Sequence, residues 1–138
     1  KINDNLGVHV ASELKNELKK KKIKINEAKI LIMGLTFKEN CADIRNSGIQ
    51  SVIKKLKSFK CKLDLYDPWV DREEIKETYD IFPHSELHQN TYDGIIIAVA
   101  HKKFKEMEIK AISNLCKKNH IIYDLKYLFK KSQTNMRL

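Results

Sequence analysis

Residues 29–49 read KILIMGLTFKENCADIRNSGI, and this stretch decides the fold that we expect for the chain. Residues 29–33 are almost continuously apolar, which is typical of a parallel strand covered on both faces. A loop that opens on Gly34 follows, and Ser47 and Gln50 have the spacing of a capping box at the start of a helix. A strand, a loop and a helix N-terminus in this order outline an anion-binding site.

Strands and helices alternate along the rest of the chain. Apolar spacing predicts helices over residues 4–21, 49–59, 71–79 and 104–115, and apolar runs predict strands over residues 62–66, 95–100 and 121–125, with a shorter candidate strand at 81–82. This order predicts an α/β fold, a Rossmann-like parallel sheet with helices on both faces and right-handed crossovers.

We expect three parts along the chain. Residues 1–25 hold an amphipathic helix, whose apolar stripe could pack on the sheet or on a preceding domain, and a polar linker. Residues 26–130 form the sheet domain, and the polar residues 131–138 are expected to be a frayed tail. Because the chain begins at Lys1 rather than Met, we expect it to be a piece of a longer protein.

Composition restricts the class of protein. No apolar run reaches the roughly 18–20 residues that a membrane span needs, so no membrane partner is expected. The cysteines at 41, 61 and 116 are odd in number and far apart, which argues against disulfides and a zinc site and favours a cytoplasmic location. His84 and His88 have helical i,i+4 spacing, but no further ligand lies near them, and we expect no metal.

The formal net charge of +9 comes mostly from lysine, with only three arginines in the chain. Proteins that read nucleic acids usually cluster arginine with aromatic residues, so a solvated lysine-rich surface is the simpler interpretation and no nucleic-acid partner is expected. The charge still favours attraction to polyanions, including phosphorylated small molecules.

Ligands of such sheets bind beyond the carboxyl ends of the strands, where the loop after residue 33 lies. A dinucleotide fingerprint needs three glycines there, but only Gly34 is present, and Thr36 and Phe37 occupy positions that would have to be small. This domain is therefore not expected to bind NAD in the ordinary Rossmann manner. Asp67, which follows the second strand, is interpreted as a turn cap rather than a ribose ligand.

Lys38 is the strongest candidate for a phosphate contact, and its alternative is a surface lysine paired with Glu39 or Asp43. Arg45 suits a diphosphate because of its planar fork, and Asp43 is a candidate to orient it. Taken from the residues alone, Phe37 is more simply a core side chain than a base-stacking one.

No catalytic residue is predicted. Cys41 lies in a polar loop without a histidine near it in sequence, so we reject it as a nucleophile. His101 follows the most apolar strand, where it could contact a ligand or serve as a structural or capping residue. The residues alone therefore describe a binding domain.

Six segments resemble one family in chain order: NDNLG at 3–7, GLTFKEN at 34–40, DIRNS at 43–47, YDPWVD at 66–71, YDGIIIAVAHKKF at 92–104 and IIYDLK at 121–126. They resemble the C-terminal, UDP-binding domain of the UDP-glucose/GDP-mannose dehydrogenase family. The sequences of these segments most resemble those of the branch that oxidises UDP-N-acetylhexosamines for surface polysaccharide.

The resemblance implies an enzyme that oxidises C6 of a UDP-hexose to a carboxylate with NAD⁺ as the oxidant. It implies that Phe37, Lys38 and Lys126 bind the substrate and that Arg45 reaches NAD held by another domain. Residues 1–25 would be the end of a central dimerisation helix in a homodimer. The NAD domain and the nucleophilic cysteine would lie outside this chain, which is expected to be inactive alone.

Two other classes of function stay open at this point. A basic nucleic-acid-binding module would bind DNA or RNA with steep salt dependence. A non-catalytic oligomerisation or regulatory α/β domain would bind neither UDP nor nucleic acid and would associate through the helix that carries Leu6 and Leu18.

Overall fold

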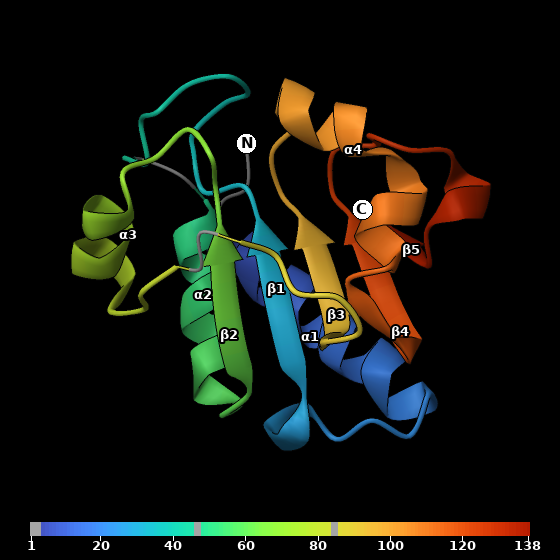
Figure 1. Ribbon diagram of the computed structural model, residues 1–138. Helices are drawn as coiled ribbons and strands as arrows, with labels where there is room; N and C mark the ends of the chain where they lie inside the picture. The colour runs from blue at the N-terminus through green and yellow to red at the C-terminus, as the bar shows by residue number, and fades with distance from the viewer. Residues whose placement is uncertain (1–3, 46–47, 84–85) are drawn as a thin grey trace.

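The computed structural model describes residues 4–45, 48–83 and 86–138, and its centre is a parallel sheet (Figure 1). Five strands lie in the order β2-β1-β3-β4-β5, and every neighbouring pair is parallel. The strands are β1 (Lys29–Met33), β2 (Lys62–Tyr66), β3 (Tyr92–Ile97), β4 (Cys116–Asp124) and β5 (Met136–Arg137). The predicted Rossmann-like parallel sheet is confirmed.

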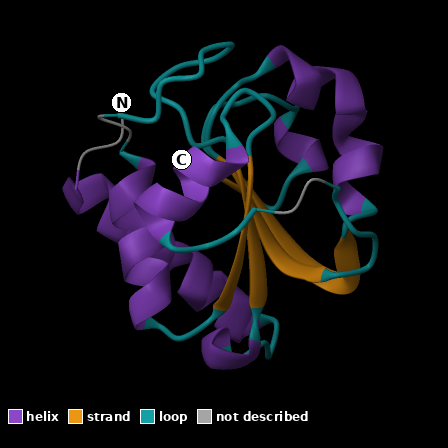
Figure 2. Ribbon diagram, turned by 60° about the vertical axis from the view of Figure 1, so that its left-hand side comes forward, coloured by secondary structure: helices purple, strands orange, loops and turns teal. Residues whose placement is uncertain are grey.

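Helices cover both faces of the sheet, as Figure 2 shows with the strands seen nearly edge-on. The helices are α1 (Asp4–Lys20), α2 (Ile49–Ser58), α3 (Arg72–Tyr79) and α4 (Lys102–Ser113). Helices α1 and α2 pack with one set of alternating strand side chains, and α4 packs with the opposite set. Helix α3 lies beside the edge strand β2 (Figure 1). No helix in the described parts of the chain is long and apolar enough to cross a membrane.

Helix α1 shares its core with the sheet. Val10, Leu14 and Leu18 are fully buried and belong to the same hydrophobic cluster as the side chains of β1 on that face. A Cβ atom on Gly7 would lie 1.8 Å from Oγ of Ser51, so α1 and α2 approach this closely only because residue 7 has no side chain. Of the two predicted partners for the stripe, the structure shows the sheet. The assignment of residues 1–25 to a dimerisation helix stays a prediction.

The boundaries of the first two strands are those predicted, whereas β3 and β4 begin earlier than their apolar runs. Strand β3 starts at Tyr92, whose hydroxyl donates a hydrogen bond of 2.6 Å to Asp64, and it ends at Ile97. Ala98 and Val99 remain buried after the strand has ended, which explains why the apolar run predicted a strand up to residue 100. Residues 81–82 form no strand.

The helix starts differ in how they are capped. Asp71 caps α3, since its side chain accepts a hydrogen bond from the N–H of Glu73. Helix α2 has Gly48 at its N-cap position without a side-chain cap. Ser47, on which the predicted capping box depended, lies outside the described residues.

The prediction of a frayed tail is wrong. Lys131–Gln133 form a short 3-10 helix, and the edge strand β5 then pairs with β4. Asn135 supports this arrangement because its side-chain oxygen accepts the N–H of Ile122 and its own N–H donates to the Ile122 carbonyl. Backbone pairing orders a polar segment that has little apolar surface to bury.

Candidate functional site

The loop of residues 34–45 lies at the switch point of the sheet. It follows β1, and β1 has β2 on one side and β3 on the other. The chain therefore leaves β1 between the carboxyl ends of two neighbouring strands, where ligands of open α/β sheets bind. The loop predicted to carry the site is thus in the expected place.

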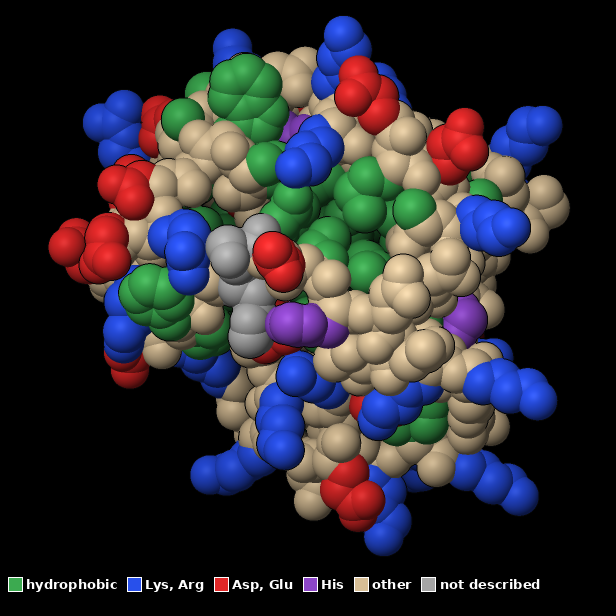
Figure 3. Space-filling view, viewed as in Figure 1, with side chains coloured by type: hydrophobic (Ala, Val, Ile, Leu, Met, Phe, Trp, Pro, Cys, Tyr) green, Lys and Arg blue, Asp and Glu red, His purple; other side chains and the backbone are tan. Residues whose placement is uncertain are grey.

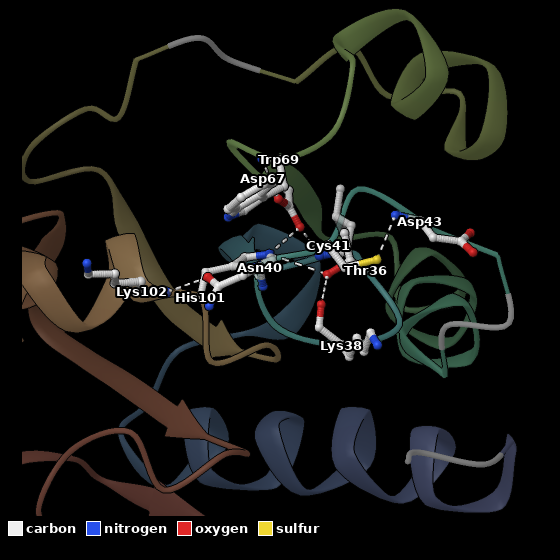
Figure 4. A network of polar contacts seen from close by, with 10 residues as sticks. Thr36, Lys38, Asn40, Cys41, Asp43, Asp67, Trp69, His101 and Lys102 are labelled. Atoms are coloured by element: carbon white, nitrogen blue, oxygen red, sulfur yellow. Dashed lines mark hydrogen bonds and ion pairs between the residues drawn. The ribbon is translucent and has the colours of Figure 1, made fainter.

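Asp67 connects this loop to the end of β2 (Figure 4). Its side chain is fully buried, and its Oδ2 accepts a 2.7 Å hydrogen bond from the N–H of Leu35. The same oxygen lies 3.0 Å from Nε2 of His101, and Oδ1 accepts the N–H of Trp69 at 2.9 Å. The prediction that Asp67 is a turn cap is confirmed, and the carboxylate also joins the ends of three strands.

His101 connects the loop to the end of β3, and it is fully buried. Its Nδ1 accepts a hydrogen bond of 2.9 Å from the backbone N–H of Asn40. An accepting Nδ1 carries no proton, so the ring proton is on Nε2, which faces Asp67. Oγ1 of Thr36 lies 3.4 Å from that same Nε2. Of the two roles predicted for His101, the structure shows the structural one.

Asn40 and Thr36 complete the network in Figure 4. The side-chain oxygen of Asn40 accepts the N–H of Lys102, the first residue of α4, at 3.0 Å. Oγ1 of Thr36 donates to the carbonyl of Lys38 at 2.8 Å. Asn40 has φ of +54°, which asparagine tolerates better than most residues. The sequence reasoning missed Asn40 and Thr36, because their partners lie more than 60 residues away along the chain.

Phe37 and Lys38 project from the tip of this anchored loop. Phe37 is 50% exposed, so the interpretation of its side chain as part of the core is wrong. Lys38 is exposed, and within residues 4–45, 48–83 and 86–138 its ammonium forms no ion pair. The alternative pairing with Glu39 or Asp43 is not found, and the ammonium is available to an anion.

Asp43 and Arg45 form a forked ion pair further along the loop. Nε of Arg45 donates to Oδ1 of Asp43 at 3.0 Å, and Nη2 donates to Oδ2 at 3.1 Å. The hydrogen bond from the Arg45 side chain lowers the pKa of Asp43, with a further contribution from the Arg45 backbone N–H. The predicted orientation of Arg45 by Asp43 is confirmed.

Lys126 lies two strands away at the same edge of the sheet. It is exposed, and its backbone N–H donates to Oδ1 of Asp124, the last residue of β4. Asp124 is fully buried and also accepts the N–H groups of Leu128 and Phe129. Because neighbouring strands are about 4.8 Å apart, β1 and β4 are separated by about 10 Å. The structure thus groups Phe37, Lys38 and Arg45 on one loop and places Lys126 across the sheet edge from them.

A pocket of about 240 Å³ lies beside this loop, at the end of β2. Tyr66 forms part of its wall, and Nζ of Lys103 lies 5.7 Å from the centre of the Tyr66 ring. Arg72 also lines this pocket, and its side chain donates to the carbonyl of Pro83. Basic side chains are spread over the whole face seen in Figure 3, with acidic ones among them, rather than gathered in one stripe.

The thiols and the histidines do not suggest another site. Burial raises the pKa of Cys61 to about 11 and that of Cys116 to about 12, so both are poor nucleophiles at neutral pH. Cys41 is half-buried, and its Sγ accepts the N–H of Asp43. No cluster of three potential metal ligands is found among the described residues, and His84 of the predicted pair lies outside them.

The switch-point loop of residues 34–45 has one glycine of the three that a dinucleotide fingerprint needs, and that glycine is used in packing. A Cβ atom on Gly34 would lie 2.7 Å from Cβ of Val99, so this glycine is needed for the packing of β1 against β3. One hydrogen bond, from the N–H of Asn40 to Nδ1 of His101, ties this loop to the end of β3. That this domain does not hold NAD in the ordinary Rossmann manner stays a prediction.

A parallel α/β sheet whose switch-point loop presents an aromatic ring, a free ammonium and an oriented guanidinium has the features of a nucleotide-binding domain. The chain belongs to the UDP-glucose/GDP-mannose dehydrogenase family, and its residues 31–131 match the UDP binding domain of that family. The resemblance found in the sequence motifs is confirmed.

Known relatives place the chain within that family. It is 45% identical over 138 residues to a UDP-N-acetyl-D-glucosamine 6-dehydrogenase of Salmonella typhi and 41% identical to one of Pseudomonas aeruginosa. All of the chain is aligned in both cases, and it spans about a third of the length of these curated relatives. A UDP-D-ManNAc dehydrogenase from Pyrococcus horikoshii has a similar structure, with a TM-score of 0.72 and 27% identity over 90% of this chain and 28% of the other.

Proposed function

We propose that this chain is the UDP-sugar-binding part of an enzyme that oxidises C6 of a UDP-N-acetylhexosamine to a uronic acid with NAD⁺. The observation that carries the proposal is the exposed pair Phe37 and Lys38 on a loop anchored at the switch point. The family's domain description and the names of the most similar relatives support the choice of UDP and of an N-acetylhexosamine.

Each exposed side chain at this sheet edge has a role in the proposal. The ammonium of Lys38 pairs with diphosphate oxygens, and the ring of Phe37 contacts the uridine. Lys126 supplies a second positive charge to the substrate from the end of β4. Arg45, oriented by Asp43, faces the NAD that another part of the full-length enzyme binds, since this chain lacks the glycines of a dinucleotide fingerprint after β1.

In this proposal the domain contributes binding and exclusion of water, and it contributes no nucleophile. The partners are the UDP-sugar, the NAD-binding and central parts of the same enzyme, and a second copy in a homodimer. A cytoplasmic location agrees with the free cysteines. We expect the 138-residue chain to bind UDP weakly and to oxidise no UDP-sugar alone.

An NMR titration of the chain with UDP tests the proposal, with NAD⁺ and a short DNA duplex as competing candidates. We expect shifts at Phe37 and Lys38 with UDP and little change with NAD⁺. Lys38→Ala should weaken UDP binding about tenfold, the effect of losing one charge-assisted hydrogen bond. The matched control is Lys24→Ala, an exposed lysine at the opposite end of β1.

The outcomes separate the three classes of function. Saturable UDP shifts that Lys38→Ala weakens and Lys24→Ala does not would support the UDP-sugar domain. Salt-sensitive binding of the duplex without a response to UDP would favour a nucleic-acid module. Self-association without either ligand would favour an oligomerisation domain.

A further inference from the structure

We propose that the buried pair Asp67 and His101 is a positioning device that holds residues 36–40 in the shape that presents Phe37 and Lys38 to the ligand. The inference rests on the proposed function for the identity of that ligand. It assigns to His101 a role that depends on both ring nitrogens, and it makes His101 a positioning residue rather than a catalytic one.

The first step of the argument is the placement of the anchors. Thr36 immediately precedes Phe37, and Asn40 lies two residues after Lys38. Nε2 of His101 lies 3.4 Å from Thr36 and Nδ1 accepts the N–H of Asn40, so a single ring contacts both flanks. The Asn40 side chain adds a second bond to the same corner, at Lys102. The backbone of Phe37 and Lys38 therefore spans a short bridge with fixed ends.

The second step is the chemistry of the ring. Nδ1 must accept from Asn40 while Nε2 donates to Asp67, which defines one neutral tautomer. Asp67 selects this tautomer, because its Oδ2 is an acceptor and is itself held by the N–H of Leu35. Among the amino acids, only neutral histidine has one hydrogen-bond donor and one acceptor as the two nitrogens of a rigid ring. The pair thus fixes the loop that follows β1 relative to the end of β2.

The third step is burial. The side chains of both residues have an exposed fraction of 0%, and the His101 ring packs edge-on against Phe104 with ring centres 5.2 Å apart. Water does not reach the contact between Asp67 and His101, so a bond lost there is not recovered from solvent. The exposed tip of the loop is therefore held by contacts to two fully buried side chains.

Two substitutions separate the two ring nitrogens. In His101→Gln the amide nitrogen can take the place of Nε2 and still donate to Asp67, but nothing accepts the N–H of Asn40. In His101→Asn the amide oxygen can take the place of Nδ1 and still accept from Asn40, but the bond to Asp67 is lost. His120→Gln is the control, since His120 lies in the middle of β4, away from the loop, and its Nδ1 faces the carbonyl of Lys117.

Three readouts are measured on the 138-residue chain: amide hydrogen exchange at Asn40, UDP affinity by NMR and the thermal midpoint. We expect His101→Gln to speed exchange at Asn40 and to weaken UDP binding, each about tenfold, with the smaller loss of thermal stability. His101→Asn should lose more thermal stability and keep more of the exchange protection and the UDP affinity. Nitrogen NMR of the wild-type ring should show a protonated Nε2 and a bare Nδ1.

This crossed pattern is what a merely space-filling role would not produce. If His101 only fills space, the smaller asparagine is worse than glutamine in all three readouts, and that result would overturn the inference. A wild-type ring protonated on Nδ1 would overturn it as well. If the wild-type chain binds no UDP, the proposed function fails, and exchange at Asn40 in the two variants still decides whether His101 orders the loop.

Discussion

Residues 35–40 and residues 41–45 belong to one loop, but they are held by different kinds of contact. The first half is anchored to Asp67 and His101, whose side chains are not exposed at all. In the second half the charged side chains of Asp43 and Arg45 form an ion pair and are 39% and 83% exposed. The backbone there is held by the core residue Ile44 and by the carbonyl of Asp43, which accepts the N–H of Phe37. Buried hydrogen bonds fix a position because water does not compete for them, whereas exposed ion pairs orient a side chain with little effect on stability.

The difference agrees with the proposed division of labour in the site. A substrate contact made by Lys38 benefits from a backbone that is already in place before the ligand arrives, because less ordering entropy is then lost on binding. Arg45 is proposed to reach a cofactor on another domain, so its guanidinium has to adjust when the domains close. The following predictions test whether the two halves really differ in this way.

The largest expected effect is that of Asp67→Ala on stability. The substitution leaves the buried N–H of Leu35, the buried ring of His101 and the part-buried N–H of Trp69 without their acceptor. Each unsatisfied buried group costs about 1–3 kcal/mol, so we expect the free energy of unfolding to fall by about 3 kcal/mol or more. Urea denaturation followed by the fluorescence of Trp69, the chain's one tryptophan, measures this change.

Asp71→Ala is the matched control for that experiment. Asp71 is also an acceptor for a backbone N–H, but it is exposed and caps the first turn of α3. Loss of such a cap costs about 1 kcal/mol. Equal destabilisation by the two substitutions would show that the anchoring of residues 35–40 has no special strength.

The next effect is a difference in thiol reactivity. Cys41, where the two halves of the loop meet, and Cys61 are both half-buried, but the raised pKa of about 11 leaves only about one thousandth of Cys61 as thiolate at pH 8. We expect iodoacetamide to modify Cys41 at least about tenfold faster than Cys61 or Cys116. Peptide mass spectrometry of partly labelled protein gives the order.

Ligand protection links that labelling to the site. UDP should slow the modification of Cys41. It should leave the modification of Cys61 unchanged, because Cys61 immediately precedes β2 at the amino-terminal end of the strand, away from residues 34–45. Labelling in urea, where all three thiols are accessible, is the control for intrinsic reactivity. Protection of Cys61 but not of Cys41 would contradict the placement of the nucleotide over residues 34–45.

The sequence predicted the position of the site better than its support. Strands β1 and β2 have the predicted bounds because their apolar patterns are local. Lys38 and Arg45 were predicted as site residues because the topology places their loop at the carboxyl ends of the strands, where ligands bind. The exposure of Phe37 could not be deduced from composition, since an aromatic residue beside a core strand is usually buried.

The network around His101 could not be predicted, because it is a product of the tertiary fold. Its hydrogen bonds to Asn40 and Asp67 join residues 61 and 34 positions apart, and no periodic pattern relates them. The same holds for β5, where Met136 pairs with Tyr123 through backbone groups that every residue has. Buried polar contacts and short edge strands depend on which segments meet, and the sequence signal for that is weak in a single chain.

The smallest expected effect concerns the exposed half of the loop. The hydrogen bonds from Arg45 hold the pKa of Asp43 below its ordinary value of 3.8, so the carboxylate is ionised at neutral pH and the fork is closed. A lowered carboxyl pKa contributes stability above the ordinary value, and that contribution is lost as the pH falls through the lowered one. Because both groups are solvated, Arg45→Ala should leave the thermal midpoint at pH 7 unchanged within error and move the pKa of Asp43 back up towards 3.8.

Carbon NMR of the carboxyl groups during an acid titration measures this shift directly. Asp80 provides the control, because its pKa is lowered in the same way by the hydrogen bond from Lys76, at a site outside the loop. Lys76→Ala should therefore raise the pKa of Asp80 and not that of Asp43, and Arg45→Ala should do the reverse. If Asp43 titrates identically with and without Arg45, the fork is not closed in solution. The orientation of Arg45 would then have to come from the ligand itself, although buried Ile44 and the carbonyl of Asp43, which accepts the N–H of Phe37, would still hold the backbone of residues 41–45.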